Sequence, residues 1–146
     1  MPFHLPRRQV PHFERPGGVV CLTWRVDRHR PILRPEERTI VFEVIQSCEP
    51  AFAELLAAVV MDDHVHVLVR PRIGTTGRRL VRALKGMSAQ RLVKEHARRP
   101  PIWQREYFDR WMDSPDQTTA CLAYIERNPG RRWPDITGYP WVLARG

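Results

Sequence analysis

The chain has 146 residues, of which 42% are apolar, so it is long enough for one domain with a substantial core and too short for two. No apolar run approaches the roughly 20 residues of a membrane-spanning helix, and the first residues lack an apolar signal segment, so we expect a cytoplasmic location. The three cysteines, Cys21, Cys48 and Cys121, are widely spaced, which argues against a zinc knuckle or a disulfide framework.

The formal net charge is +8, and the basic charge is concentrated in residues 70–110, which hold 12 Arg and Lys residues against three acidic ones. The rest of the chain is therefore close to neutral. A basic patch attracts polyanions, and nucleic acid is the commonest polyanion in the cytoplasm. The alternative is a solvated helix face in an arginine-rich protein, since 22 of the 24 basic residues are Arg.

Apolar spacing and turn residues predict seven elements. In chain order they are a strand at 19–26, a helix that opens at Pro35 and closes at Glu49-Pro50, two strands within 57–71 joined by a turn at Asp62-Asp63, a helix at 76–98, a strand at 102–112, and a last helix from Ser114-Pro115 to Asn128, ended by Pro129-Gly130.

The order β-α-β-β-α-β is that of the split ferredoxin-like fold, so we predict an α+β protein. Its antiparallel sheet carries helices on one face and leaves the other open for ligands, and the last helix is added at the C-terminus. One domain spans residues 1–146, with an N-terminal extension at 1–16 and a C-terminal tail at 130–146. Because this fold hosts many functions, the order alone does not identify one.

The pair His64 and His66 is the main candidate for chemistry. Side chains alternate along a strand, so both imidazoles project to one face while Val65 and Val67 project to the other. Two adjacent imidazoles can bind a metal ion. The alternative for an isolated His-x-His is a pair of surface histidines on a half-buried strand.

Tyr124 and Asn128 lie four residues apart on the last predicted helix and therefore share a face. If that face lies over the sheet, the hydroxyl and the amide can approach the histidines. A tyrosine hydroxyl is a weak nucleophile because its ordinary pKa is roughly 10, and a metal that polarises a phosphoryl group offsets this weakness. The alternative is a tyrosine packed on the sheet with its hydroxyl at the rim.

Several blocks of the chain resemble one known family. The block 61–69 resembles the hallmark of the HUH-type single-tyrosine transposases, two histidines around a hydrophobic residue. The blocks 84–86, 102–110, 124–129 and 139–141 resemble the branch associated with repetitive extragenic palindromes (REP). The resemblance extends from about Gly17 to Trp141.

The resemblance implies cleavage and strand transfer on single-stranded DNA near hairpins. It implies that His64, His66 and Asn128 bind a divalent ion, Mg²⁺ or Mn²⁺. By the same resemblance Tyr124 attacks the phosphorus, forms a 5′-phosphotyrosine link and releases a 3′-hydroxyl. The family usually has Pro-Asn before the first histidine, whereas this chain has Asp62-Asp63, which makes a turn or adjusts the metal site.

Nucleic acid is the expected partner, and the candidate contacts are basic side chains on the second helix and beside the aromatic block 102–112: Arg78, Arg79, Arg82, Lys85, Arg105 and Arg110. The aromatic residues of that block suit base stacking and core packing equally. The short connection before Pro115 favours a monomer in which Tyr124 acts on its own chain.

Two other functions stay open. One is a domesticated, non-catalytic protein that binds single-stranded nucleic acid on the same fold. The other is a metal-dependent hydrolase of small substrates, which would need further ligands at recognisable spacing and leaves the basic segment unexplained.

Overall fold

The structure is a computed structural model that describes residues 13–145. Of the predicted N-terminal extension, residues 1–12 therefore lie outside the described part. Just after them, the Glu14 carboxylate accepts hydrogen bonds from the backbone N–H groups of Gly77 and Arg78, at 2.8 and 3.2 Å. Among the described residues, no helix is long and apolar enough to cross a membrane.

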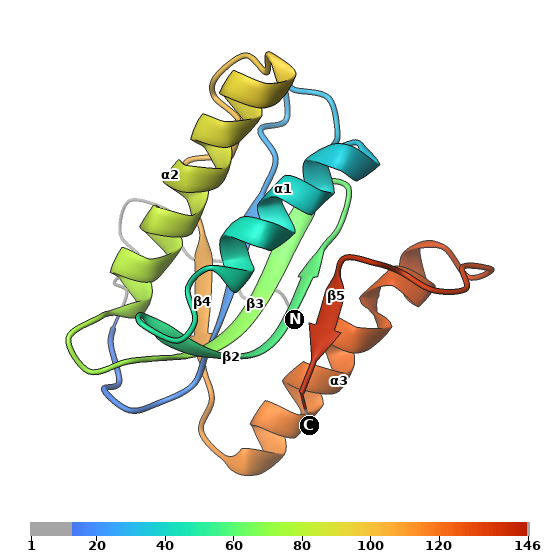
Figure 1. Ribbon diagram of the computed structural model, residues 1–146. Helices are drawn as coiled ribbons and strands as arrows, with labels where there is room; N and C mark the ends of the chain where they lie inside the picture. The colour runs from blue at the N-terminus through green and yellow to red at the C-terminus, as the bar shows by residue number, and fades with distance from the viewer. Residues whose placement is uncertain (1–12, 146) are drawn as a thin grey trace.

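The described chain forms one antiparallel sheet and three helices (Figure 1). In order they are β1 (Val20–Arg25), α1 (Pro35–Gln46), β2 (Ala53–Val60), β3 (His64–Pro71), α2 (Gly77–His96), β4 (Phe108–Trp111), α3 (Pro115–Arg132) and β5 (Val142–Ala144). The strand order in the sheet is β4-β1-β3-β2-β5. Its first four members have the predicted ferredoxin-like order, so the predicted α+β class is confirmed.

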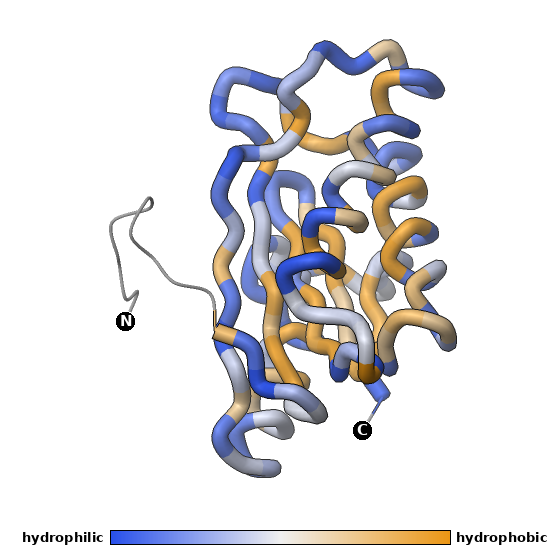
Figure 2. The backbone as a smooth tube through the Cα atoms, turned by 90° about the vertical axis from the view of Figure 1, so that its left-hand side faces the viewer, coloured by the Kyte–Doolittle hydropathy of each residue, from blue (hydrophilic) through white to orange (hydrophobic). Residues whose placement is uncertain are grey.

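The sheet lies between two layers of helices, and each layer has its own apolar core. Helices α1 and α2 cover one face, where Leu22 and Trp24 of β1 are fully buried. Helix α3 packs on part of the other face through the fully buried Ile125, against Val59 and Leu68. Figure 2 shows apolar residues along the strands and hydrophilic residues in many connecting loops. The face that we expected to be open is therefore partly covered by α3.

Side-chain alternation along β3 follows the prediction. Val65 and Val67 belong to the core under α1 and α2, whereas Leu68 belongs to the core under α3. His64 and His66 therefore lie on the α3 side of the sheet. Strand β3 is central, paired with β1 on one side and β2 on the other, so its backbone is held along its whole length.

Helix α3 does not end at Asn128, as its sequence predicted, but continues through Pro129 to Arg132. A proline inside a helix removes one backbone hydrogen bond and costs about 3 kcal/mol. Burial of Asn128 and Pro129 offsets this cost. So does an ion pair at the final residue, where Arg132 Nη2 lies 2.7 Å from Asp62 Oδ2.

Two other predicted segments contain different elements in the structure. The strand predicted at 102–112 is reduced to β4. Ahead of β4, the segment meets the end of β1 through the isolated bridge Val26↔Trp103 and a hydrogen bond from the Gln104 N–H to the Arg25 carbonyl. The carbonyl oxygens of Gln104 and Arg105 accept hydrogen bonds from Lys85 Nζ, so this segment is not a continuous strand. The tail predicted at 130–146 contains β5, which pairs with β2 from Ala57↔Ala144 to Val59↔Val142. A three-residue strand carries too little alternation to be recognised from sequence.

Candidate metal and tyrosine site

The two histidines lie side by side on β3, and their ring centroids are 4.7 Å apart. On the neighbouring β1, Thr23 is paired with His66 and Arg25 with His64. Directly paired residues of an antiparallel sheet project to the same face, so these side chains line the site with the histidines.

Each imidazole has its Nδ1 atom held by an oxygen of this chain. His64 Nδ1 lies 2.7 Å from Asp63 Oδ1, and His66 Nδ1 lies 2.8 Å from Thr23 Oγ1. When Nδ1 carries the proton and donates it to these oxygens, both Nε2 atoms keep a free lone pair. This arrangement is typical of metal-binding histidines, whose second nitrogen is fixed by a hydrogen bond.

Helix α3 places two more side chains beside the histidines. Asn128 is 7% exposed, and its Oδ1 lies 3.3 Å from His64 Nε2. The Tyr124 ring lies 5.6 Å from the His66 ring, at an interplanar angle of 72°. Tyr124 remains 42% exposed. The structure therefore brings together the four residues predicted for metal binding and nucleophilic attack.

The surroundings keep His66 neutral. Burial, the neighbouring His64 and the positive charge of Arg25 lower the pKa of His66 to about 3. Burial of Asp63 acts to raise its pKa, but the hydrogen bond and charge of His64, together with Arg132 and Arg25, lower it overall. A neutral imidazole is the form that binds metals.

The predicted turn at Asp62-Asp63 does more than reverse the chain. Asp63 holds His64, while Asp62 is 3% exposed and forms the ion pair with Arg132 at the end of α3. No group of three or more His, Cys, Asp and Glu side chains suited to a metal occurs among residues 13–145. The donor set at this site is therefore two imidazoles and one amide.

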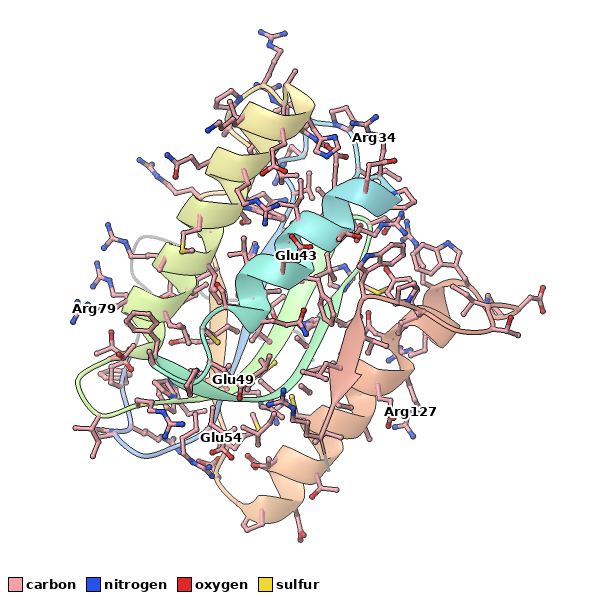
Figure 3. All side chains as sticks on the ribbon, viewed as in Figure 1. Arg34, Glu43, Glu49, Glu54, Arg79 and Arg127 are labelled. Atoms are coloured by element: carbon pink, nitrogen blue, oxygen red, sulfur yellow. The ribbon has the colours of Figure 1, made fainter. Side chains whose placement is uncertain are left out.

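Five of the six predicted DNA contacts are exposed arginines, and the sixth, Lys85, is partly buried. Arg78, Arg79 and Arg82 are exposed on α2, and Figure 3 shows Arg79 projecting outward from that helix. Arg110 is exposed on β4 and paired with Cys21, which lies on the α3 side of the sheet. Arg105 is exposed in the segment before β4.

Lys85 differs from these arginines, because its Nζ donates to two backbone carbonyls and is partly buried. Burial also lowers its pKa. Lys85 therefore fixes the segment before β4 in place of presenting a free ammonium group.

Sequence reasoning missed two arginines at the site. Arg25 projects beside His64, and the Arg131 guanidinium lies 5.3 Å from the centre of the Tyr124 ring. Arg131 follows Tyr124 by seven residues, a helical spacing that becomes visible only once the helix is extended through Pro129. Pairing of Arg25 with His64 depends on strand register, which the sequence does not specify.

The fold is similar to those of solved transposases. A REP-associated tyrosine transposase bound to a REP hairpin has a TM-score of 0.73 at 17% identity, over 92% of this chain and 81% of that one. A proposed transposase from Deinococcus radiodurans R1 has a TM-score of 0.53 at 24% identity, over 86% of this chain and 97% of that one. No curated protein sequence matches this chain.

The amino-acid sequence also matches a family model. A family model described as "Transposase IS200 like" matches residues 19–128, a span that includes His64, His66, Tyr124 and Asn128. The match covers most of the chain, and the protein therefore belongs to the IS200-like transposase family.

Proposed function

We propose that this protein cleaves and rejoins single-stranded DNA next to hairpins, with Tyr124 as the nucleophile and a divalent metal as cofactor. The observation that carries the proposal is the joint placement of Tyr124 beside His66 and of Asn128 Oδ1 beside His64 Nε2, by one helix face. Membership of the transposase family supports this chemistry over a small-substrate hydrolase.

His64, His66 and Asn128 would hold the metal ion, which we propose to be Mg²⁺ or Mn²⁺. The amide oxygen of Asn128 is the kind of ligand that suits Mg²⁺ and Mn²⁺. The contacts of Asp63 and Thr23 keep both Nε2 atoms available as the other two ligands. When bound, the ion would polarise the scissile phosphate and stabilise the charge that develops on it.

Tyr124 would carry the covalent step. Its Oη forms a bond to phosphorus while the bond from phosphorus to the 3′ oxygen breaks. The phenolic proton leaves to water, and the departing 3′ oxygen takes a proton from water. The product is a 5′-phosphotyrosine link and a free 3′-hydroxyl, which can attack the link in the reverse direction. The guanidinium groups of Arg25 and Arg131 attract the phosphate to this position.

The exposed arginines of α2 and β4 would bind the DNA. A related fold is bound to a REP hairpin, which supports hairpin DNA as the partner of this chain. We propose that the protein acts as a monomer in the cytoplasm, with Tyr124 and the histidines in the same chain.

Incubation with hairpin-bearing single-stranded DNA and Mn²⁺ tests the proposal. We expect a covalent adduct that survives denaturation and is absent after addition of EDTA. Hairpin binding without any adduct would instead indicate a domesticated, non-catalytic protein. Release of phosphate from small esters without DNA cleavage would indicate the hydrolase.

A further inference from the structure

A wide pocket of about 640 Å³ lies at the C-terminal end of α3, away from Tyr124. Its walls come from three parts of the chain: the first turns of α1, the end of α3 and the segment that leads to β5. The side chains that define it are Arg38, Arg132, Trp133, Ile136, Tyr139 and Trp141.

Aromatic rings and guanidinium groups form the walls together. The Trp133 and Tyr139 rings are stacked, with centroids 5.6 Å apart, and Trp141 meets Tyr139 edge-on at 5.1 Å. The Arg38 guanidinium lies 5.6 Å from the Trp133 ring centre and 5.2 Å from that of Trp141. Arg132 lies 5.7 Å from the Trp133 ring centre.

Hydrogen bonds hold these rings in place. The Tyr139 hydroxyl donates to the carbonyl oxygen of Val60 at 2.6 Å, and Trp141 Nε1 donates to Thr39 Oγ1 at 2.9 Å. Rings that are already oriented lose little conformational entropy when a ligand stacks on them. The pocket is therefore organised in the free protein.

The pocket adjoins the turn that presents the histidines. Arg132 forms its ion pair with Asp62, next to the Asp63 that holds His64. Val60, the partner of Tyr139, is the last residue of β2 before that turn. Along α3, Arg132 lies four residues beyond Asn128, which is about 6 Å of helix rise.

We propose that this pocket binds an unpaired nucleobase of the DNA strand that enters the tyrosine site. This inference rests on the proposed function. Aromatic faces stack on any base, and guanidinium groups stack on bases or pair with the adjoining phosphates. Of the two arginines that line the pocket, Arg132 is paired with Asp62, and Arg38 lies over the Trp133 and Trp141 rings. A guanidinium beside aromatic faces suits a base with its adjoining phosphate better than an apolar or basic peptide.

The test compares two probes in EDTA, so that cleavage does not alter them. One is a DNA hairpin with a single-stranded flank, and the other is the same hairpin without the flank. We expect the wild-type protein to bind the flanked probe at least about fivefold more tightly, the lower end of base stacking on an aromatic ring. Trp133→Ala should remove this preference and leave the affinity for the blunt hairpin unchanged.

A second variant covers the case in which Trp133→Ala fails to fold. Ile136 is 37% exposed at the pocket, so Ile136→Asp adds a negative charge there with little effect on packing. We expect it to remove the flank preference as well. Gln46→Glu adds the same charge on the exposed surface of α1 and should retain the preference.

Photo-crosslinking locates the base directly. With 5-iododeoxyuridine in the flank, crosslinks should map to the segment that holds Trp133, Tyr139 and Trp141. Equal binding of both probes by the wild-type protein, or a flank preference that survives both pocket variants, would overturn the pocket and leave DNA binding intact. Failure to bind either probe would overturn the proposed function and the pocket with it.

Discussion

The rings of Tyr124 and His66 lie 5.6 Å apart, although Tyr124 belongs to helix α3 and His66 to the central strand β3, far apart in the sequence. The contact depends on α3 lying on the face of the sheet to which His66 projects. Tyr124 stays 42% exposed while its ring contacts His66 and the guanidinium of Arg131.

Tyr124→Phe should abolish the covalent DNA adduct. The substitution removes the hydroxyl and retains the ring, so the free energy of unfolding should fall by about 1 kcal/mol or less. Adduct formation on hairpin-bearing DNA and a urea unfolding curve measure the two effects. Tyr107→Phe is the control and should retain the adduct. Peptide mapping that places the nucleotide on Tyr107 would contradict the assignment.

His64→Ala and His66→Ala should each abolish cleavage and leave hairpin binding largely intact, because the exposed arginines supply most of the attraction. Asp63→Ala should have a smaller effect. This substitution leaves His64 in place but removes the carboxylate that holds its Nδ1 atom. The Mn²⁺ concentration needed for half-maximal cleavage should therefore rise by about 10- to 100-fold. Cleavage that persists in EDTA would show that no metal takes part.

Substitution of Arg78, Arg79 and Arg82 by Ala should weaken DNA binding and flatten its dependence on salt. The slope of log K against log salt should become shallower by about 0.7 for every phosphate that is no longer neutralised. Arg28→Ala, at an exposed position in the loop after β1, is the control.

Lys85→Ala should lower stability more than it changes the slope, because Lys85 Nζ donates hydrogen bonds to two backbone carbonyls. An unchanged slope in the triple variant would place the DNA on another surface.

Oxidation of Cys21 and Cys121 should show whether the tyrosine helix packs on its own chain. The two thiols, one on β1 and one on α3, both pack against the core under α3, and their interaction lowers the pKa of Cys121 and raises that of Cys21. A diazene oxidant such as diamide takes two electrons and two protons from them, and a disulfide forms. We expect a crosslink within one chain on a non-reducing gel, absent from Cys121→Ser. Burial raises the pKa of Cys48 to about 11, so Cys48 should stay reduced. A disulfide-linked dimer would indicate exchange of α3 between two copies.

Stability should fall in acid because of one buried ion pair. Burial of Glu37 acts to raise its pKa, but hydrogen bonds from Arg98 and from the backbone of Arg34 lower it from 4.5 to about 2. A lowered folded-state pKa gives stability that is complete above pH 4.5 and declines as the pH falls toward 2. The decline should be on the order of 3 kcal/mol. Urea midpoints measured over this pH range should decline less steeply in Glu37→Gln than in the wild type.

Local patterns predicted the parts of the site that lie within single elements. Alternation along β3 placed His64 and His66 on one face of the strand. Helical spacing placed Tyr124 and Asn128 on one face of α3. Both patterns arise from backbone geometry that any strand or helix shares, so they are visible without tertiary structure.

Features that depend on packing were not visible in the sequence. Pro129 predicts the end of a helix, and only its burial with Asn128 and the Arg132–Asp62 ion pair explain why α3 continues. The aromatic pocket brings together residues from α1, α3 and the segment before β5, which share no local pattern. Lys85 has the charge of a DNA contact, and its carbonyl partners are evident only in three dimensions.

The sheet ends on both sides in short strands, four residues in β4 and three in β5. An edge strand is a template on which another chain can add its own strand, and long, flat, apolar edges promote aggregation. Here β5 covers the C-terminal half of β2, and β4 carries the charged Asp109 and Arg110. Few backbone groups are left in register for an incoming strand, so growth of the sheet by addition of a second copy is unfavourable at either edge.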